Sequence, residues 1–299
     1  MGPPDTSSFR RLANPPRPVP LLVRQRVLFG GMTSQMGWVF FGFGMIFFWA
    51  FVWRADLTSW YRFRGVVPVA DGQVIRSSDT GASEGGSKNR RGTPIYKNEF
   101  LFLVDDREYR NASYAVGTRL AVGRRVRVQY LANDPSLARI QGMRANVFGP
   151  AVLFVLLFPS VGFGLVVFSV SRGIKACRLL SHGVPTTGRL ISKEATAVKE
   201  NGRSVYKLTF EFETGEGRSC TATARTNAPE KFREQGEPLV YDPENPVRAV
   251  MLDNLPGAPH IGDDGHVYCR QPTRALLSLL VPLATTLGHG AYVWRILTR

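Results

Sequence analysis

Five side chains with metal-binding chemistry lie close together near the carboxyl-terminal end of the chain. They are His260, Asp263, Asp264, His266 and Cys269. Imidazole, carboxylate and thiolate groups are the usual ligands of zinc in proteins. Their spacing matches no standard zinc pattern, and two glycines interrupt the run, which is typical of a floppy loop. We therefore expect a loop with no cofactor, and the alternative is a metal site at His260, His266 and Cys269.

A second polar group follows a strand-like run. Residues 241–246 read YDPENP and carry carboxylate and amide oxygens that suit a hard cation. The two prolines favour instead a fixed turn, in which Asp242 and Asn245 bond their own backbone. We expect the turn.

His289 stands inside an apolar block, between Gly288 and Gly290. An ionisable group within a membrane segment is a candidate for proton or ligand handling. The alternative is a neutral imidazole that bonds to a neighbouring helix or lies near the interface. We favour that structural alternative and retain His289 as the intramembrane polar candidate.

No enzyme signature accompanies these residues. The GxSxG, HExxH and GxGxxG patterns do not occur in the context that each requires. Residues 85–88 read GGSK, which lacks the spacing of a phosphate-binding loop. We also find no nucleophile paired with a base. The sequence therefore predicts a protein that is not an enzyme.

Three apolar blocks dominate the elements that must position these residues. Residues 147–170 hold 24 positions without a charge, enough to cross a hydrocarbon core of about 30 Å. Trp38 and Trp53 flank the first block like interface anchors, and Arg295 lies close enough to the end of the third to reach the headgroups. The predicted transmembrane helices are 36–53, 147–171 and 275–297.

Glycines in the first block allow two interpretations. Gly37, Gly42 and Gly44 either permit close helix packing or merely lower side-chain bulk. In the middle block, Pro159 leaves open a bend. A block that crosses once places the flanking segments on opposite sides of the membrane, whereas a re-entrant block bent at Pro159 places them on the same side.

Two polar segments, 54–146 and 172–254, form the predicted β-modules. In the second, Leu208, Phe210 and Phe212 alternate with polar residues, as in a strand with one buried face. Residues 79–93 and 255–274 are rich in Gly and polar side chains and predict loops. The fold class is thus an α+β membrane protein, with three transmembrane helices and two small antiparallel β-barrel or sandwich-like modules.

The amino-terminal residues 1–35 form a predicted disordered basic arm followed by an interfacial segment. Residues 1–20 are rich in Pro, Ser and Arg without an apolar period. Residues 21–29 mix apolar side chains with Arg24 and Arg26, which predicts a short amphipathic helix along the membrane interface.

The two polar segments share a pattern at a period of about 110 residues. Gly72-Gln73-Val74-Ile75 corresponds to Gly188-Arg189-Leu190-Ile191; Ile95-Tyr96-Lys97 with Phe100 and Phe102 corresponds to Val205-Tyr206-Lys207 with Phe210 and Phe212; and Tyr130, Pro135 and Ala138 correspond to Tyr241, Pro246 and Ala249. Agreement in both order and spacing predicts an internal repeat.

This pattern resembles the domain of unknown function 3592 family, in two tandem copies. The resemblance rests on a Gly-x-Val/Leu strand, a Tyr-x-x-x-Phe-x-Phe strand and the run 240–249, which reads VYDPENPVRA. The first copy departs from the last motif, because residues 128–135 read VQYLANDP. The resemblance implies a membrane-anchored β-rich domain and no activity, substrate or catalytic residue.

The net charge of the chain limits the classes of binding partner. The formal net charge is +15 and the pI about 10.3, but no compact basic helix or aromatic-interleaved pattern indicates nucleic acid. Basicity of this kind also suits a protein beside anionic lipid headgroups. Arginines precede the first block and follow the second, which favours a cytoplasmic amino terminus in the bacterial inner (plasma) membrane, although Arg54, Arg62 and Arg64 argue the other way.

Two functions remain open. The first is a non-enzymatic binding or scaffold protein, associated with the membrane or envelope, whose β-modules contact a protein partner through strand edges. The second is an accessory subunit of a transporter or lipid-handling system that uses intramembrane polar groups such as His289. Three crossings are few for a complete carrier, so the second function requires a partner or a homo-oligomer. We favour the first.

Overall fold

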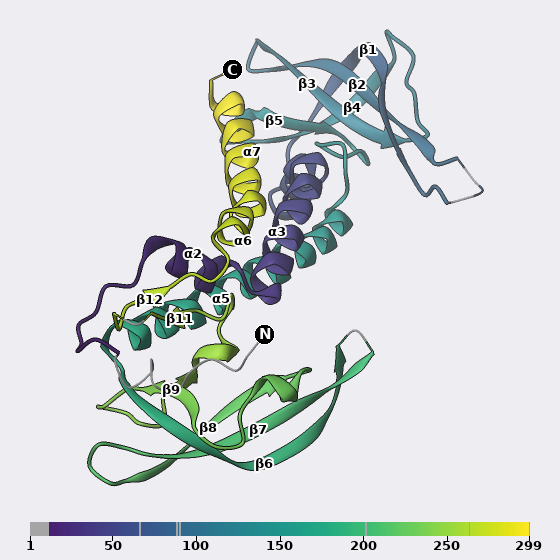
Figure 1. Ribbon diagram of the computed structural model, residues 1–299. Coiled ribbons are helices and arrows are strands. Elements are labelled where there is room, and N and C mark those ends of the chain that lie inside the picture. Colours follow the sequence, from purple (N-terminus) through teal and green to yellow (C-terminus); the bar gives the residue numbers. More distant parts are fainter. Residues whose placement is uncertain are drawn as a thin grey trace. The chain divides into compact units, whose positions relative to one another are not determined.

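The computed structural model describes residues 12–65, 67–87, 89, 91–200, 202–262 and 264–298. The chain divides into two compact units (Figure 1). The first unit lies within Met1–Gly42 and Ser160–Arg299 and contains the second β-module. The second unit lies within Phe43–Pro159 and contains the first β-module. Each unit holds one five-stranded β-sheet together with parts of the long helices.

Three helical segments are long and apolar enough to cross a membrane: Met32–Arg54, Pro150–His182 and Pro272–Leu297. They confirm the three predicted spans by length and composition. The α-helices are α2 (Leu21–Phe29), α3 (Met32–Ala50), α4 (Leu57–Tyr61), α5 (Leu157–His182), α6 (Pro272–Leu277) and α7 (Leu280–Leu297).

The middle span extends further than its apolar block. A 3₁₀ segment, η2 (Pro150–Leu156), leads into α5, which continues to His182. Pro159 stands in the first turn of α5, where its missing N–H has no helical partner to lose, so the helix is not interrupted there. Residues 172–182, assigned above to the second β-module, are therefore the end of this helix, with Ala176 and Leu180 buried.

The first β-module is a five-stranded antiparallel sheet with the order β3-β2-β1-β4-β5. Its strands are β1 (Val69–Glu84), β2 (Thr93–Val104), β3 (Arg107–Val116), β4 (Arg125–Leu131) and β5 (Asp134–Ile140). Phe100 and Phe102 of β2 and Val128 of β4 are buried in its core. Strand β1 runs through residues 79–84, so the predicted loop is shorter than its composition indicated.

The second β-module is another five-stranded antiparallel sheet, with the order β10-β9-β6-β7-β8. Its strands are β6 (Val184–Glu200), β7 (Arg203–Glu213), β8 (Ser219–Thr226), β9 (Glu237–Tyr241) and β10 (Ala249–Met251). The alternation of β7 is confirmed, because Leu208, Phe210 and Phe212 are buried. The region after β10, predicted as a loop, contains a small hairpin of β11 (His260–Ile261) and β12 (Val267–Tyr268).

Both sheets are open, so the barrel-like closure that we predicted is wrong. In the first sheet the outer strands β3 and β5 approach each other but are joined by side chains rather than a ladder. Asn111 donates to the Ser136 carbonyl at 2.7 Å, and the Ile140 N–H donates to Ser113 Oγ at 2.7 Å. In the second sheet, β10 has three residues, which is too short to close the sheet against β8.

The two sheets share their register at the positions that the sequence pattern aligns. Gly72 pairs with Phe102 in the first sheet, and Gly188 pairs with Phe212 in the second. Register shifts follow Val74 in β1 and Leu190 in β6, and a second pair of shifts begins at Asp79 and Ala195. The same path of pairing and bulging thus occurs twice.

Close backbone approach explains the two aligned glycines. A Cβ at Gly72 would lie 2.7 Å from Val128 Cγ2, and a Cβ at Gly188 would lie 2.9 Å from Leu239 Cδ2. Val128 and Leu239 occupy equivalent core strands, β4 and β9. Either side chain would have to shift to admit even a methyl group.

Glycines also bring the long helices into contact. Within the first unit, a Cβ at Gly37 would lie 2.9 Å from the Val166 amide nitrogen, and one at Gly42 would lie 2.7 Å from Thr285 Oγ1. A Cβ at Gly162 would collide with the Phe41 backbone. Of the two interpretations of these glycines, close packing is the one that the structure bears out.

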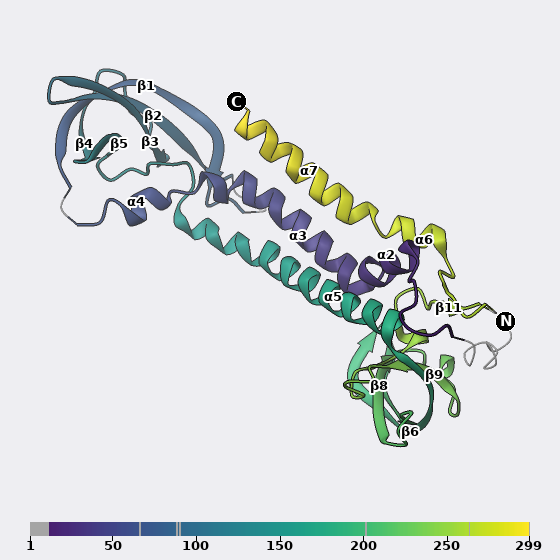
Figure 2. The same ribbon diagram turned by 90° about the vertical axis from the view of Figure 1, so that its left-hand side faces the viewer.

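The segment that precedes the first span packs against α5 and the second β-module, within the same unit (Figure 2). Val23 and Val27 lie four residues apart on one face of α2 and are buried in a cluster that includes Leu180 and Val240. The apolar face of α2 therefore covers protein. Residues 12–20, assigned to a disordered arm, are part of the same cluster through Val19, whereas residues 1–11 lie outside the described residues.

Candidate functional site

The histidines of the predicted metal loop are held by local contacts. His260 in β11 packs on the ring of Tyr268 in β12, with centroids 5.8 Å apart. Asp264 accepts hydrogen bonds from the Tyr268 hydroxyl at 2.6 Å and from the His266 N–H at 3.1 Å. These bonds lower the pKa of Asp264 and raise that of Tyr268. The Asp264 carboxylate therefore stabilises the hairpin of β11 and β12.

The other members of that cluster do not complete a site. Cys269 is packed against the apolar cluster of α2 and α5. Asp263 lies outside the described residues. Among the residues that the structure describes, no three His, Cys, Asp or Glu side chains gather closely enough to hold a metal ion.

The predicted turn after β9 closes through its own backbone. The Glu244 N–H donates to Asp242 Oδ1 at 3.1 Å, and the Asn245 N–H donates to the Asp242 carbonyl at 3.1 Å. The Tyr241 hydroxyl accepts from the Gly215 N–H at 2.9 Å and so anchors the neighbouring hairpin. This is the geometry of the turn rather than of a cation site.

His289 joins two helices of the first unit. Its Nε2 lies 3.0 Å from the carbonyl oxygen of Gly42 in α3. The carbonyl accepts, so Nε2 carries the proton in this contact. This contact corresponds to the structural alternative, in which the imidazole bonds a neighbouring helix.

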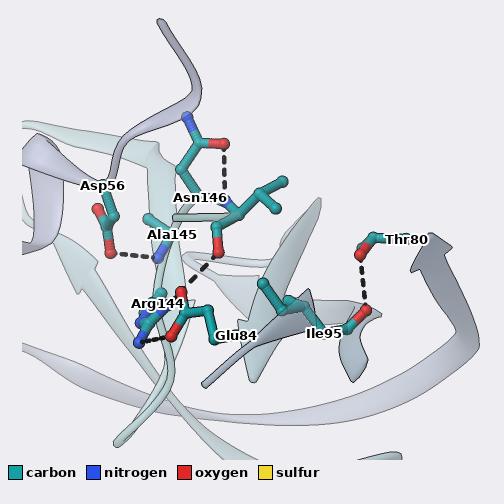
Figure 3. Close-up of polar contacts among 8 residues, drawn as sticks. Asp56, Thr80, Glu84, Ile95, Arg144, Ala145 and Asn146 are labelled. Atoms are coloured by element: carbon teal, nitrogen blue, oxygen red, sulfur yellow. Dashed lines mark hydrogen bonds and ion pairs between the residues drawn. The ribbon is translucent and has the colours of Figure 1, made fainter. Parts of the chain in front are cut away.

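A polar junction links Asp56, the residue ahead of α4, to the segment that follows β5 (Figure 3). Asp56 is 2% exposed; its Oδ1 accepts from the Ser59 N–H and its Oδ2 from the Ala145 N–H, both at 2.8 Å. Next to it, Arg144 Nη2 donates to Glu84 Oε2 at 3.0 Å, and this pairing raises the pKa of Arg144. The carboxylates are satisfied, so the junction is structural.

The most site-like feature is a cavity of about 380 Å³ in the first unit. Three cationic side chains and one carboxylate line it: Arg26 from α2, Lys231 from η3 (Pro229–Lys231), Arg270 just ahead of α6, and Asp253 from η4 (Leu252–Asn254). The formal charge of this set is +2. No acidic group lies within 4.0 Å of Arg26 or Lys231 in the described part of the chain.

Two glycines fix the position of Arg26 in this cavity. A Cβ at Gly30 would lie 2.6 Å from Arg26 Cδ, and a Cβ at Gly257 would lie 3.1 Å from Arg26 Nε. Gly257 also has a φ of +86°, which favours glycine. Arg26 Nη1 donates to the Arg274 carbonyl at 3.4 Å, while Nε is buried without a hydrogen-bond partner among the described residues.

Asp253 makes the cavity mixed in charge. Burial raises its pKa, and the nearby cations Arg270, Arg233 and Lys231 oppose that rise. The carboxyl is thus an acceptor set among cations. A ligand here meets positive charge with one hydrogen-bond acceptor beside it.

A buried glutamate in the second sheet was not predicted. Glu237 is 0% exposed, and its Oε2 accepts from the Arg233 N–H at 2.8 Å, while Oε1 has no partner among the described residues. Burial raises the pKa of Glu237 to about 7. The internal pattern held a signal for it, because the equivalent position in the first sheet is Val126, which pairs with Gly72 as Glu237 pairs with Gly188.

The cavity residues were missed for a different reason. The sequence places Arg26 in a predicted interfacial helix. Lys231 and Asp253 are 22 positions apart, Asp253 and Arg270 are 17 positions apart, and no motif connects them. Only their meeting in the fold makes them a site.

No protein-family model matches the chain, and no curated protein or solved structure matches it.

Proposed function

We propose that the protein is a non-enzymatic membrane scaffold that binds a protein partner through the outer edge of β8 in the second β-module. The single observation that carries this proposal is that edge. Strand β8 pairs with β7 on one side, and no other described strand forms a ladder with its other side. An unpaired edge is a template for strand addition by a partner.

The composition of β8 supports the same function. It reads SCTATART, with three β-branched threonines, one charge and no proline. Lysine, proline and bulges are the common means of blocking an edge, and β8 has none of them. The edges of the first sheet differ, because side chains of β3 bond backbone groups of β5.

The resemblance of both modules to the domain of unknown function 3592 family fits this proposal, and the shared register of the sheets supports an origin by internal duplication. The proposed partner is a membrane or envelope protein. The proposed location of the present protein is the bacterial inner membrane, with its own amino terminus in the cytoplasm. The alternative function, a transporter accessory acting through His289, is less favoured because that side chain already bonds Gly42.

Photocrosslinking from one row of the sheet tests the edge. Thr223 of β8 pairs with Thr209 of β7, which pairs with Ser192 of the central strand β6. A photoreactive residue at Thr223 is expected to give a discrete adduct in native membranes, and one at Ser192 to give none. A Thr221→Lys substitution, which charges the edge, should abolish the adduct.

A Ser192→Lys substitution is the control, since it adds the same charge at the centre of the sheet. Loss of the adduct with both lysines, or equal adducts from Thr223 and Ser192, would contradict binding at the edge.

A further inference from the structure

The cationic cavity lies close to two predicted membrane entries. Arg26 precedes the first span, which begins at Met32, and Arg270 precedes the third, which begins at Pro272. Helices α2 and α6 contact each other, so these two entries belong to one side of the protein. Six residues separate Arg26 from Met32 and two separate Arg270 from Pro272, so both arginines lie close to the points where the first and third spans begin.

The charges of the cavity define its ligand. Two arginines and one lysine line it, and Arg26 Nε is a buried donor without a partner among the described residues. Guanidinium groups bind phosphate through paired donors, and the set has a formal charge of +2. Near pH 7 a phosphate monoester or free phosphate carries a charge of about −1.5 to −2, and a lipid phosphodiester about −1, so this cationic set attracts either kind of phosphate.

The remaining lining refines this chemistry. Asp253 repels a second anionic group but accepts from a hydroxyl or ammonium group attached to the phosphate. The volume of about 380 Å³ is at the lower end of the range for small-ligand sites, roughly 300–1,000 Å³. It suits a phosphorylated headgroup better than a bulky molecule.

From this geometry we propose that the cavity formed by Arg26, Lys231, Arg270 and Asp253 is a binding site for a phosphate group. This site is separate from the β8 edge and does not depend on the function proposed above. The phosphate belongs either to an anionic lipid headgroup in the same leaflet or to a free phosphate anion. The two sources share the recognition by the three cations.

Binding to the full-length protein tests the proposal. Retention of phosphatidylglycerol is measured by native mass spectrometry after release from nanodiscs, and binding of radiolabelled inorganic phosphate by equilibrium dialysis in a phosphate-free detergent. The double variant Arg26→Gln/Arg270→Gln is expected to weaken binding about tenfold or more, because it removes both guanidinium groups. Lys231→Gln should weaken binding about threefold.

The Lys231 side chain makes no hydrogen bond or ion pair among the described contacts and is exposed, so this variant separates binding from folding. The charge-matched control is Arg218→Gln/Arg225→Gln, two exposed arginines of the same module outside the cavity. It should bind like the unmodified protein.

The two binding measurements distinguish a lipid headgroup from a free phosphate anion as the source of the phosphate. Loss of lipid retention alone in the cavity variants assigns the site to a headgroup, and loss of inorganic phosphate binding alone assigns it to a free anion; loss of both supports the shared chemistry. Absence of binding to the unmodified protein, or equal effects of the cavity and control variants, would overturn the proposal.

Discussion

At the scale of single residues, the second sheet contains an acid where the first has an apolar side chain. Glu237 and Val126 occupy equivalent positions, yet only Glu237 carries a group that prefers water. Its carboxyl is buried with one oxygen unpartnered among the described residues, and burial raises its pKa to about 7. A buried carboxyl of this kind is stable as the protonated acid and unfavourable as the anion.

Glu237 should make the stability of the protein depend on pH. Its pKa in the folded state, about 7, lies above the ordinary value of 4.5, so folding favours proton binding. The stabilising contribution is complete below pH 4.5 and is lost as the pH rises through 7. We expect Glu237→Gln to raise the free energy of unfolding at pH 8 by about 2–3 kcal/mol and to flatten this dependence.

Thermal unfolding in detergent between pH 5 and pH 8.5 measures the effect. Glu234→Gln, at an exposed position three residues away, is the matched control and should leave the profile unchanged. An unaltered profile in Glu237→Gln would show that the carboxyl is ionised and solvated in the folded protein.

At the scale of elements, the long helices of the first unit are held together by backbone proximity. Gly162 of α5 faces the backbone of Phe41 in α3, whereas Gly164, two residues on, has nothing within 4 Å of a Cβ position. The rings of Phe41 and Phe163 meet beside this contact at 6.0 Å. Association of this type depends on small residues because lipid provides no hydrophobic drive between helices.

The two glycines of α5 form a matched pair. Gly162→Ala should lower the free energy of unfolding in detergent by about 1–3 kcal/mol, because its methyl group displaces the Phe41 backbone. Gly164→Ala should leave stability unchanged or raise it slightly, since alanine is the better helix former. The measurement is the unfolding transition of each variant at equal protein levels. Equal destabilisation by both would exclude the Phe41 contact as the cause.

At the scale of the whole molecule, the segment before the first span meets the chain that follows the second. The Arg17 side chain is 3% exposed and donates to the carbonyls of Leu180 and Gly183 at 3.0 and 2.8 Å. Ser181 Oγ donates in return to the Arg17 carbonyl at 2.8 Å. These two parts must lie on one side of the membrane, which requires an even number of crossings between them.

Two single crossings satisfy that requirement and predict the first β-module on the opposite side. In a cysteine-free background, an impermeant maleimide should label Ala132→Cys in intact cells, and should label Asn14→Cys and Glu216→Cys only after permeabilisation. All three positions are exposed in the structure. Equal labelling of Ala132→Cys and Glu216→Cys would contradict two single crossings.

The sequence alone determined the elements whose signals are local. Length and apolarity define three spans, and alternation defines β7, because these patterns follow from solvent preference along one segment. The turn between β2 and β3 is equally local, since Asp105 and Asp106 have φ of 49° and 59°, a conformation that Asp tolerates.

Tertiary structure decided everything that depends on contacts distant in sequence. Sheet closure depends on whether outer strands meet, and the end of α5 depends on the burial of Leu180 against Val23, so neither follows from local pattern. The packing of residues 12–20 and the cationic cavity arise in the same way. Arg26 and Arg270 are 244 positions apart, and only the fold places their charges around one space.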